Sequence, residues 1–270
     1  MILKNILKNI ICGAAVVALL AACNDIDEND RLIYVEPVAA SRCVLVEEFS
    51  GQFCVNCPEG AETLHSIQKE YGADSVIVVT IHAGSLALKE NEYPGWIGLA
   101  NPIGEKLYEA VGKPSQPAAV IDRRTPALAR PDWLGEIKNS LQLSSNVFLT
   151  VENQYDLAAR QLDVTIKVKS TIDYSGNLHV WLTEDGIEAY QDYPTTHDEK
   201  YVHNNIFRTS ITSDPIAGDG ISLSINDEVP SEYKYSITLR EDYKPENMSI
   251  VAFVDNANGV EQTIKAKVVD

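Results

Sequence analysis

The fold of the first half of this chain is decided by residues 48–58, whose sequence is Glu-Phe-Ser-Gly-Gln-Phe-Cys-Val-Asn-Cys-Pro. The two cysteines, Cys54 and Cys57, follow an apolar strand predicted over residues 44–49 and precede a helix predicted over residues 58–71. Unpaired N–H groups and the positive end of the helix dipole stabilise a thiolate at such a helix start. The order strand, Cys-x-x-Cys, helix is therefore typical of a redox-active dithiol.

The N-terminus has the pattern of a secretory signal. Basic residues are followed by an apolar run over residues 10–20 and then by small residues, which predicts a signal peptide over residues 1–22. The run ends in Leu-Ala-Ala-Cys at residues 20–23, which resembles the lipobox of bacterial lipoproteins. This resemblance implies cleavage before Cys23 and lipidation of its sulfur and amino group. The alternative is an ordinary signal peptide in which Cys23 is incidental.

Residues 23–40 begin with an acidic polar stretch that cannot bury itself, and we expect a flexible tether there. In lipoproteins of the Bacteroidota, an acidic run directly after the lipidated cysteine resembles a signal for display on the outer face of the outer membrane. We therefore expect an outer-membrane lipoprotein exposed at the cell surface. Anchorage that faces the periplasm, with the acidic run as a solvated spacer, is the rival interpretation.

The composition narrows the class of partner. The chain carries 22 basic and 39 acidic residues, for a formal net charge of −17. A surface that neutralises phosphates is missing, which argues against a nucleic-acid partner. Anionic lipid surfaces are disfavoured too, so membrane attachment depends on the lipidated N-terminus. Only Cys43, Cys54 and Cys57 remain after the tether, too few for a fold held by disulfides.

Two domains are predicted from a change of hydrophobic period. Residues 41–145 alternate short apolar strands with helical patterns, which indicates an α/β domain with a mainly parallel sheet. From residue 146 the period becomes two, most clearly over residues 162–168. Roughly seven short strands without helices between them predict an all-β immunoglobulin-like sandwich over residues 146–270.

Aligned on its motif, the first domain resembles thioredoxin. That family has an acid six positions before the first cysteine, and Glu48 holds that place. The resemblance implies a buried proton relay for Cys57, with Cys54 at the outer edge as the attacking thiolate and Cys57 as the resolving thiol. A carboxyl group in an apolar setting has a raised pKa, which suits that role. Two departures from thioredoxin are the Val-Asn dipeptide between the cysteines, which leaves the redox direction open, and Phe53 in place of tryptophan.

The thioredoxin family also has a cis-proline before a strand, packed against the disulfide. The sequence Ser-Gln-Pro-Ala-Ala-Val at residues 115–120 fits this pattern. The resemblance implies a cis Gln116–Pro117 bond facing the cysteines, with the backbone of Gln116 pairing with substrate. A proline before a buried strand is otherwise a strand-entry device.

Other features carry weaker signals. Residues 84–100 form a longer link than expected and could make a lip over the dithiol. Cys43 is interpreted as a buried, inert thiol. A metal site is not expected, because His65 and His82 lie at no zinc-motif spacing. The group of polar residues from His197 to Glu199, with His203, is interpreted as a solvated loop.

The lipobox, the thioredoxin-like motif and Tyr-Val-His-Asn-Asn at residues 201–205 together are similar to the outer-membrane-protein-28-related lipoprotein family of Bacteroidota. The resemblance implies outer-membrane lipoproteins, some described as adhesins or receptors, whose biochemical activity is not settled. Two functions stay open. The first is a thiol–disulfide oxidoreductase without a cofactor, which acts on a protein thiol or disulfide. The second is a surface lipoprotein whose sandwich binds a protein ligand while the thioredoxin-like domain is a scaffold. A structural disulfide at Cys54 and Cys57 would favour the second.

Overall fold

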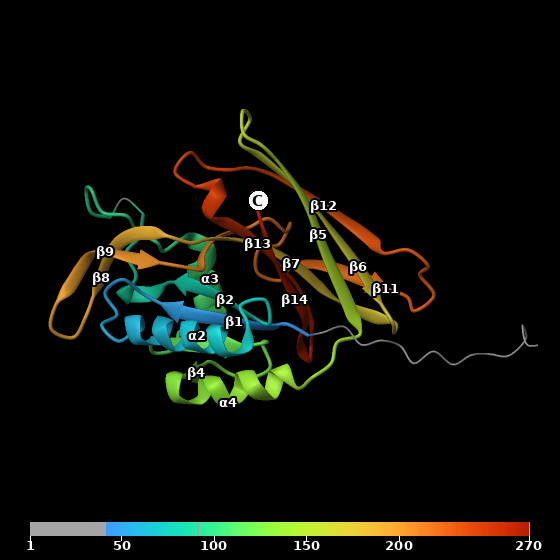
Figure 1. The fold of residues 1–270 in the computed structure, drawn as a ribbon, viewed down its shortest axis with the longest axis horizontal. Coiled ribbons are helices and arrows are strands. Elements are labelled where there is room, and N and C mark those ends of the chain that lie inside the picture. Colours follow the sequence, from blue (N-terminus) through green and yellow to red (C-terminus); the bar gives the residue numbers. More distant parts are fainter. Residues whose placement is uncertain (1–41, 91, 270) are drawn as a thin grey trace, which may run out of the picture. The chain divides into compact units, whose positions relative to one another are not determined.

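A computed structural model describes residues 42–90 and 92–269, which belong to one compact unit (Figure 1). The predicted signal peptide, the lipidation site Cys23 and the acidic tether lie outside the described residues. No helix of the described part is long and apolar enough to cross a membrane.

The first half of the described chain mixes strands and helices. Its elements are β1 (Val44–Ser50), α2 (Cys57–Tyr71), β2 (Val76–His82), η2 (Gly84–Leu86), α3 (Pro102–Ala110), β3 (Ala118–Ile121), β4 (Leu128–Ala129) and α4 (Arg130–Leu141). Strand β1 is parallel to β2 but antiparallel to β3, and β3 is antiparallel to β4. The prediction of a mainly parallel sheet is therefore wrong here. The link between β3 and β4 is too short for the crossover that a parallel pair requires.

The second half consists mostly of strands. They are β5 (Val147–Asp156), β6 (Gln161–Ser170), β7 (Tyr174–Glu184), β8 (Ile187–Asp192), β9 (His197–His203), β10 (Ile206–Ser210), β11 (Asp219–Leu223), β12 (Ser231–Thr238), β13 (Met248–Asn256) and β14 (Gly259–Lys267), with the short helix η3 (Pro245–Asn247) before β13. Burial alternates along β6, as its period of two predicts. The described protein is thus mainly β-sheet with few helices.

One sheet runs through both halves of the sequence. Its strand order is β14-β13-β7-β10-β2-β1-β3-β4, with β11 also paired to β7. Strand β10 joins the halves, because Ile206 pairs with Thr80 of β2. This pairing covers an edge of β2 that the first four strands leave open. The boundary predicted between residues 145 and 146 therefore does not divide the sheet, and the two-domain division stays a prediction from the sequence pattern.

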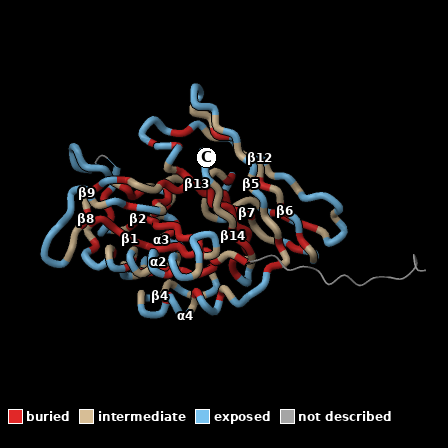
Figure 2. Tube along the Cα trace, viewed as in Figure 1, coloured by how far each residue is buried: buried red, intermediate tan, exposed pale blue. Residues whose placement is uncertain are grey.

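Three large apolar cores lie between the sheets and helices, and Figure 2 shows the buried segments of the chain. One lies between a second sheet, β12-β6-β5, and strands β7 and β13. Another packs α2 and α4 against one face of β1 and β2. The third is shared, because Phe49 of β1 clusters with Trp181 of β7 and Phe253 of β13. The two halves are thus held together by common apolar burial.

Candidate functional site

Cys54 and Cys57 form a disulfide at the start of α2, with their Cα atoms 5.4 Å apart. Pro58 follows in the first turn, where its missing N–H leaves no bond unmade. Cys54 is 3% exposed and Cys57 is 2% exposed. The structure therefore corrects the expectation that Cys54 lies at an exposed outer edge.

The cysteines are buried because the hairpin of β8 and β9 covers the motif loop. The side-chain Nε2 of Gln191, in β8, donates a hydrogen bond of 3.0 Å to the carbonyl oxygen of Cys54. The backbone N–H of Asp192 donates one of 2.8 Å to the carbonyl oxygen of Gln52. No local sequence signal marks this cover, because Gln191 lies 137 residues beyond Cys54.

Gln52 also ties a second segment to the motif loop. Its side chain is fully buried, and its Nε2 donates hydrogen bonds to the carbonyl oxygens of Ile97 (2.9 Å) and Tyr190 (3.2 Å). The ring of Trp96 stacks on that of Tyr190 with centroids 4.3 Å apart. The segment predicted as a lip, residues 84–100, thus contacts the motif loop and the hairpin together.

Polar side chains gather at the carboxyl ends of β1 and β2, on the face beneath α2. In the parallel register Glu48 pairs with Thr80, and Ser50 pairs with His82. Because side chains alternate along a strand, these four residues share the face whose earlier positions, such as Val46, pack against α2. All four are buried.

Glu48 is the buried acid that the motif predicts. Its side chain is 1% exposed and has no cationic partner among the ion pairs of the described residues. The hydroxyl of Thr80 donates a hydrogen bond of 2.8 Å to Oε2, while Oε1 has no hydrogen-bond partner. Burial raises the pKa of Glu48 to about 7, and the Thr80 hydrogen bond opposes that rise. This carboxyl can accept or release a proton near neutral pH.

The Gln116–Pro117 peptide bond is cis, as the motif implies. A Cβ placed on Gly60 of α2 would lie 3.2 Å from Cβ of Pro117 and 3.1 Å from Oε1 of Glu48. The proline and the acid thus face the same turn of α2, directly after Cys57. The side chain of Gln116 donates a hydrogen bond of 2.8 Å to the carbonyl oxygen of Ala83. Pairing of its backbone with a substrate stays a prediction.

A cavity of about 340 Å³ lies between α2 and β9. Cys57 lines it and Cys54 does not. Its floor includes Glu48 and His82, and its exposed residues include Glu62. Its lining contains carboxyl, imidazole, amide and hydroxyl groups but neither lysine nor arginine.

Two buried histidines meet in this cavity. His82 is 2% exposed and His203 is 3% exposed, and their ring centroids lie 5.3 Å apart in an edge-to-face arrangement. Burial lowers the pKa of His82 well below its usual value and that of His203 to about 4, so both rings are neutral at pH 7. The Nδ1 atom of His82 has no hydrogen-bond partner. The interpretation of residues 197–203 as a solvated loop is wrong, because they form β9 and its last residue is buried.

Across the described residues, no group of three or more His, Cys, Asp or Glu side chains is arranged to hold a metal ion. Cys43 is a free cysteine of intermediate exposure beside the shared core, so the interpretation of a buried thiol is wrong in its burial. Burial raises the pKa of its thiol, which favours the inert form.

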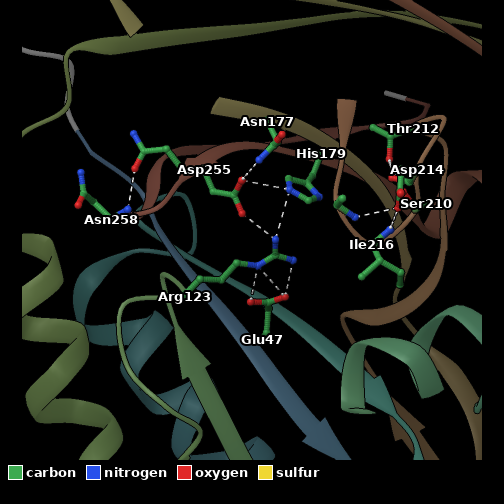
Figure 3. Close-up of polar contacts among 12 residues, drawn as sticks. Glu47, Arg123, Asn177, His179, Ser210, Thr212, Asp214, Ile216, Asp255 and Asn258 are labelled. Atoms are coloured by element: carbon green, nitrogen blue, oxygen red, sulfur yellow. Dashed lines mark hydrogen bonds and ion pairs between the residues drawn. The ribbon is translucent and has the colours of Figure 1, made fainter. Parts of the chain in front are cut away.

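A second buried polar cluster lies on the opposite face of β1 (Figure 3). The guanidinium group of Arg123 forms ion pairs with Glu47 (3.0 Å) and Asp255 (2.8 Å). His179 lies within 3.3 Å of Asp255, and the Arg123 guanidinium also covers the ring of Phe253. These contacts connect β1 and the turn after β3 with β7 and β13. No sequence motif marks this cluster.

Comparison with known proteins adds the family and the fold. No curated protein matches the chain. One solved structure, HBP35 of Porphyromonas gingivalis, shares 16% sequence identity with a TM-score of 0.65, covering 84% of this chain and 75% of that chain. At that identity the likeness shows the fold alone. Another, the sporulation control protein Spo0M of Bacillus subtilis, shares 10% identity with a TM-score of 0.31, covering 46% of this chain and 48% of that one.

The family profile of outer membrane protein Omp28 matches residues 104–270. The match contains β9 with His203 but begins after the Cys-Val-Asn-Cys motif, so the assignment to the family does not depend on that motif. On this match over more than half of its length, the chain belongs to the outer membrane protein Omp28 family.

Proposed function

We propose that this protein is a lipoprotein of the outer membrane whose Cys54–Cys57 pair carries out thiol–disulfide exchange. The observation that carries the proposal is the buried carboxyl of Glu48, which lines the same cavity as Cys57 and has a pKa of about 7. A disulfide with a purely structural role needs no such group beside it. A buried acid without a cationic partner costs stability, and such costs are typical of sites of chemistry.

Each residue has a role in the exchange. The start of α2 favours the thiolate of Cys54 in the reduced protein, because unpaired N–H groups and the helix dipole point toward it. Cys57 forms or breaks the disulfide bond to Cys54. Glu48 accepts the proton that Cys57 loses and returns it in the reverse step. The cis-proline at residue 117 faces the same turn of α2 as Glu48 does.

The proposal is tested with purified protein lacking residues 1–22. Equilibration with glutathione buffers, followed by alkylation and mass spectrometry, gives the reduction potential of the pair. We expect a potential in the range of exchangeable disulfides, above about −300 mV. We also expect Glu48→Gln to slow the release of a mixed disulfide without slowing its formation. A pair that stays oxidised in strongly reducing buffers would contradict the proposal.

A second function is favoured by the burial of both cysteines. The hairpin of β8 and β9 covers the motif loop, and the side chains of Tyr93 and Trp96 beside it are 48% and 42% exposed. In this alternative the disulfide is structural and the protein is a surface lipoprotein that binds a protein ligand. Resistance of the disulfide to reduction would support it.

The proposed location depends on residues outside the described part. The family is one of outer membrane proteins, and the lipobox at Cys23 supplies the proposed anchor. Mass spectrometry of the membrane-extracted N-terminus should find an acylated Cys23. Protease treatment of intact cells then separates display on the cell surface from a periplasmic orientation.

A further inference from the structure

The approach to the disulfide from the motif loop is closed. In the hairpin of β8 and β9, the side chain of Gln191 donates a hydrogen bond to the carbonyl oxygen of Cys54. The backbone N–H of Asp192 donates one to the carbonyl oxygen of Gln52. Trp96 stacks on Tyr190 of the same hairpin. A folded protein cannot bring a thiol to Cys54 from this side unless the hairpin moves.

A second approach passes through the cavity. Its residues include Cys57, and its volume of about 340 Å³ suits a small molecule rather than a polypeptide segment with its neighbours. The lining also includes Glu48 and His82, whose Oε1 and Nδ1 atoms have no hydrogen-bond partner. Each belongs to a residue at most 2% exposed, so buried polar groups form this part of the lining.

The charge of the lining selects among small thiols. Glu48 and Glu62 are its acidic residues, and neither lysine nor arginine lines it. The two buried histidines are neutral, and the third histidine of the lining, His65, is exposed. An ammonium group would be attracted to this lining, and a carboxylate would be repelled.

We propose that the cavity between α2 and β9 binds low-molecular-weight aminothiols and delivers their sulfur to Cys57. This inference rests on the proposed exchange function and names the substrate class of the same site. Access through the cavity, not through the motif loop, sets which thiols react.

The reaction balances with the thiol alone. The thiolate of the first aminothiol forms a bond to Sγ of Cys57, the bond between Cys57 and Cys54 breaks, and Cys54 leaves as a thiolate next to the start of α2. A second aminothiol attacks the sulfur of the first in the mixed disulfide, and Cys57 leaves as a thiolate. The protons of the two thiols pass to the two cysteines. Two thiols are oxidised to one disulfide, and one protein disulfide is reduced to a dithiol.

The test compares three thiols of similar size and different charge: cysteamine, 2-mercaptoethanol and 3-mercaptopropionate. Reduction of the disulfide is followed at pH 8 by alkylation and mass spectrometry. Each rate is expressed per thiolate and divided by the rate with a synthetic disulfide peptide of residues 52–59, which removes intrinsic reactivity. We expect the normalised rates to fall in the order given, by about fivefold from first to last. Glu48→Gln should remove most of this difference.

A second experiment tests whether the thiol enters through the cavity. Ala61→Trp places an indole in the cavity lining, and the control Ser66→Trp places one on an exposed part of α2 outside the cavity. We expect the first variant to slow reduction by cysteamine at least tenfold and the second to leave it unchanged. Reduced thioredoxin serves as the protein dithiol and should react no faster than 2-mercaptoethanol after normalisation.

The outcomes separate this inference from the function on which it rests. If no thiol of any size reduces the folded protein, the exchange function fails. If small thiols react without charge order in the wild type, or if thioredoxin reacts fastest, exchange stands and the aminothiol site is refuted. The charge order and its loss in Glu48→Gln decide the matter even if Ala61→Trp does not fold.

Discussion

Glu47 and Glu48 are neighbours in β1 but lie on opposite faces of the sheet, in opposite kinds of environment. Glu47 is paired with the guanidinium group of Arg123, which also pairs with Asp255. Glu48 has only the hydroxyl of Thr80 as a partner, and one of its oxygens has none. Both residues are at most 3% exposed, so the difference is one of pairing and not of burial.

The comparison separates a structural cluster from a candidate site. A buried ion pair with good geometry holds segments in one arrangement, and here it connects strands from both halves of the sequence. A buried acid without a cation makes no such connection and lowers stability whenever it is ionised. Its presence beside a disulfide and two neutral histidines is therefore explained better by chemistry than by folding.

The largest effect is expected from removing the cation of the structural cluster. Arg123→Met leaves Glu47 and Asp255 buried without a partner charge, and breaking such a pair costs about 3–5 kcal/mol. Urea unfolding at pH 7 measures this loss in the free energy of unfolding. Arg123→Lys, which keeps the charge but not the forked geometry, is the control and should lose less. A loss below about 1 kcal/mol for Arg123→Met would contradict the structural role of the cluster.

The neighbouring acids should respond to amide substitution with opposite signs. The pKa of Glu48 is raised to about 7 in the folded protein, so its protonated form stabilises the fold below the unfolded pKa of 4.5, and this contribution is lost as the pH rises through 7. At pH 8, Glu48→Gln should therefore increase the free energy of unfolding by roughly 3 kcal/mol, with little change at pH 4.5. Glu47→Gln should decrease it at pH 8, since the amide cannot replace the ion pair.

Urea titrations of the two variants at both pH values check this prediction. Thr80 can still donate its hydrogen bond to the amide oxygen in Glu48→Gln, so the change isolates the charge. Stabilisation by both substitutions, or by neither, would remove the distinction between the two faces.

A third effect concerns His203, whose contribution to stability depends on pH in the opposite direction to that of Glu48. Burial lowers the pKa of His203 to about 4 in the folded protein. The neutral ring therefore contributes fully to the free energy of unfolding above the unfolded pKa of 6.5, and this contribution is lost as the pH falls toward 4. Between pH 7 and pH 5 this loss amounts to about 2 kcal/mol. His203→Gln should remove that part of the acid sensitivity. His65→Gln, at the exposed mouth of the cavity, is the matched control, and an equal effect of both variants would show that burial of His203 is not the cause.

The motif-based part of the site was predictable because it is local. The cysteines, Glu48 and Pro117 follow from short sequence patterns, and the buried acid and the cis bond are both present. Thr80 and His82 are a further signal in the sequence, because they stand two positions apart in a strand that is parallel to β1. Polar residues at alternate positions near the end of an apolar strand point to one buried polar face.

The rest depends on contacts between distant segments. The polar sequence of β9 shows exposed side chains along most of its length, so the burial of His203 follows only from its position against His82. The pairing of β10 with β2 likewise has no local signal, although it decides that both halves share one sheet. The period of two predicted strands correctly but not their partners, because register depends on tertiary packing.

The smallest expected effect tests how tightly α2 packs over the acid. A Cβ on Gly60 would lie 3.1–3.2 Å from Oε1 of Glu48, Cβ of Pro117 and the indole of Trp133, none of which can move without disturbing the site. A Cβ on Gly135 of α4 would meet nothing within 4 Å. Both glycines lie inside helices, where alanine is intrinsically favoured by about 1 kcal/mol. Gly135→Ala should therefore stabilise the protein by about that amount, whereas overpacking should reverse the sign for Gly60→Ala and cost about 1 kcal/mol. Thermal and urea unfolding of the two variants side by side measures the difference, and stabilisation by both would show that the space between α2, Glu48 and Pro117 is looser than the structure indicates.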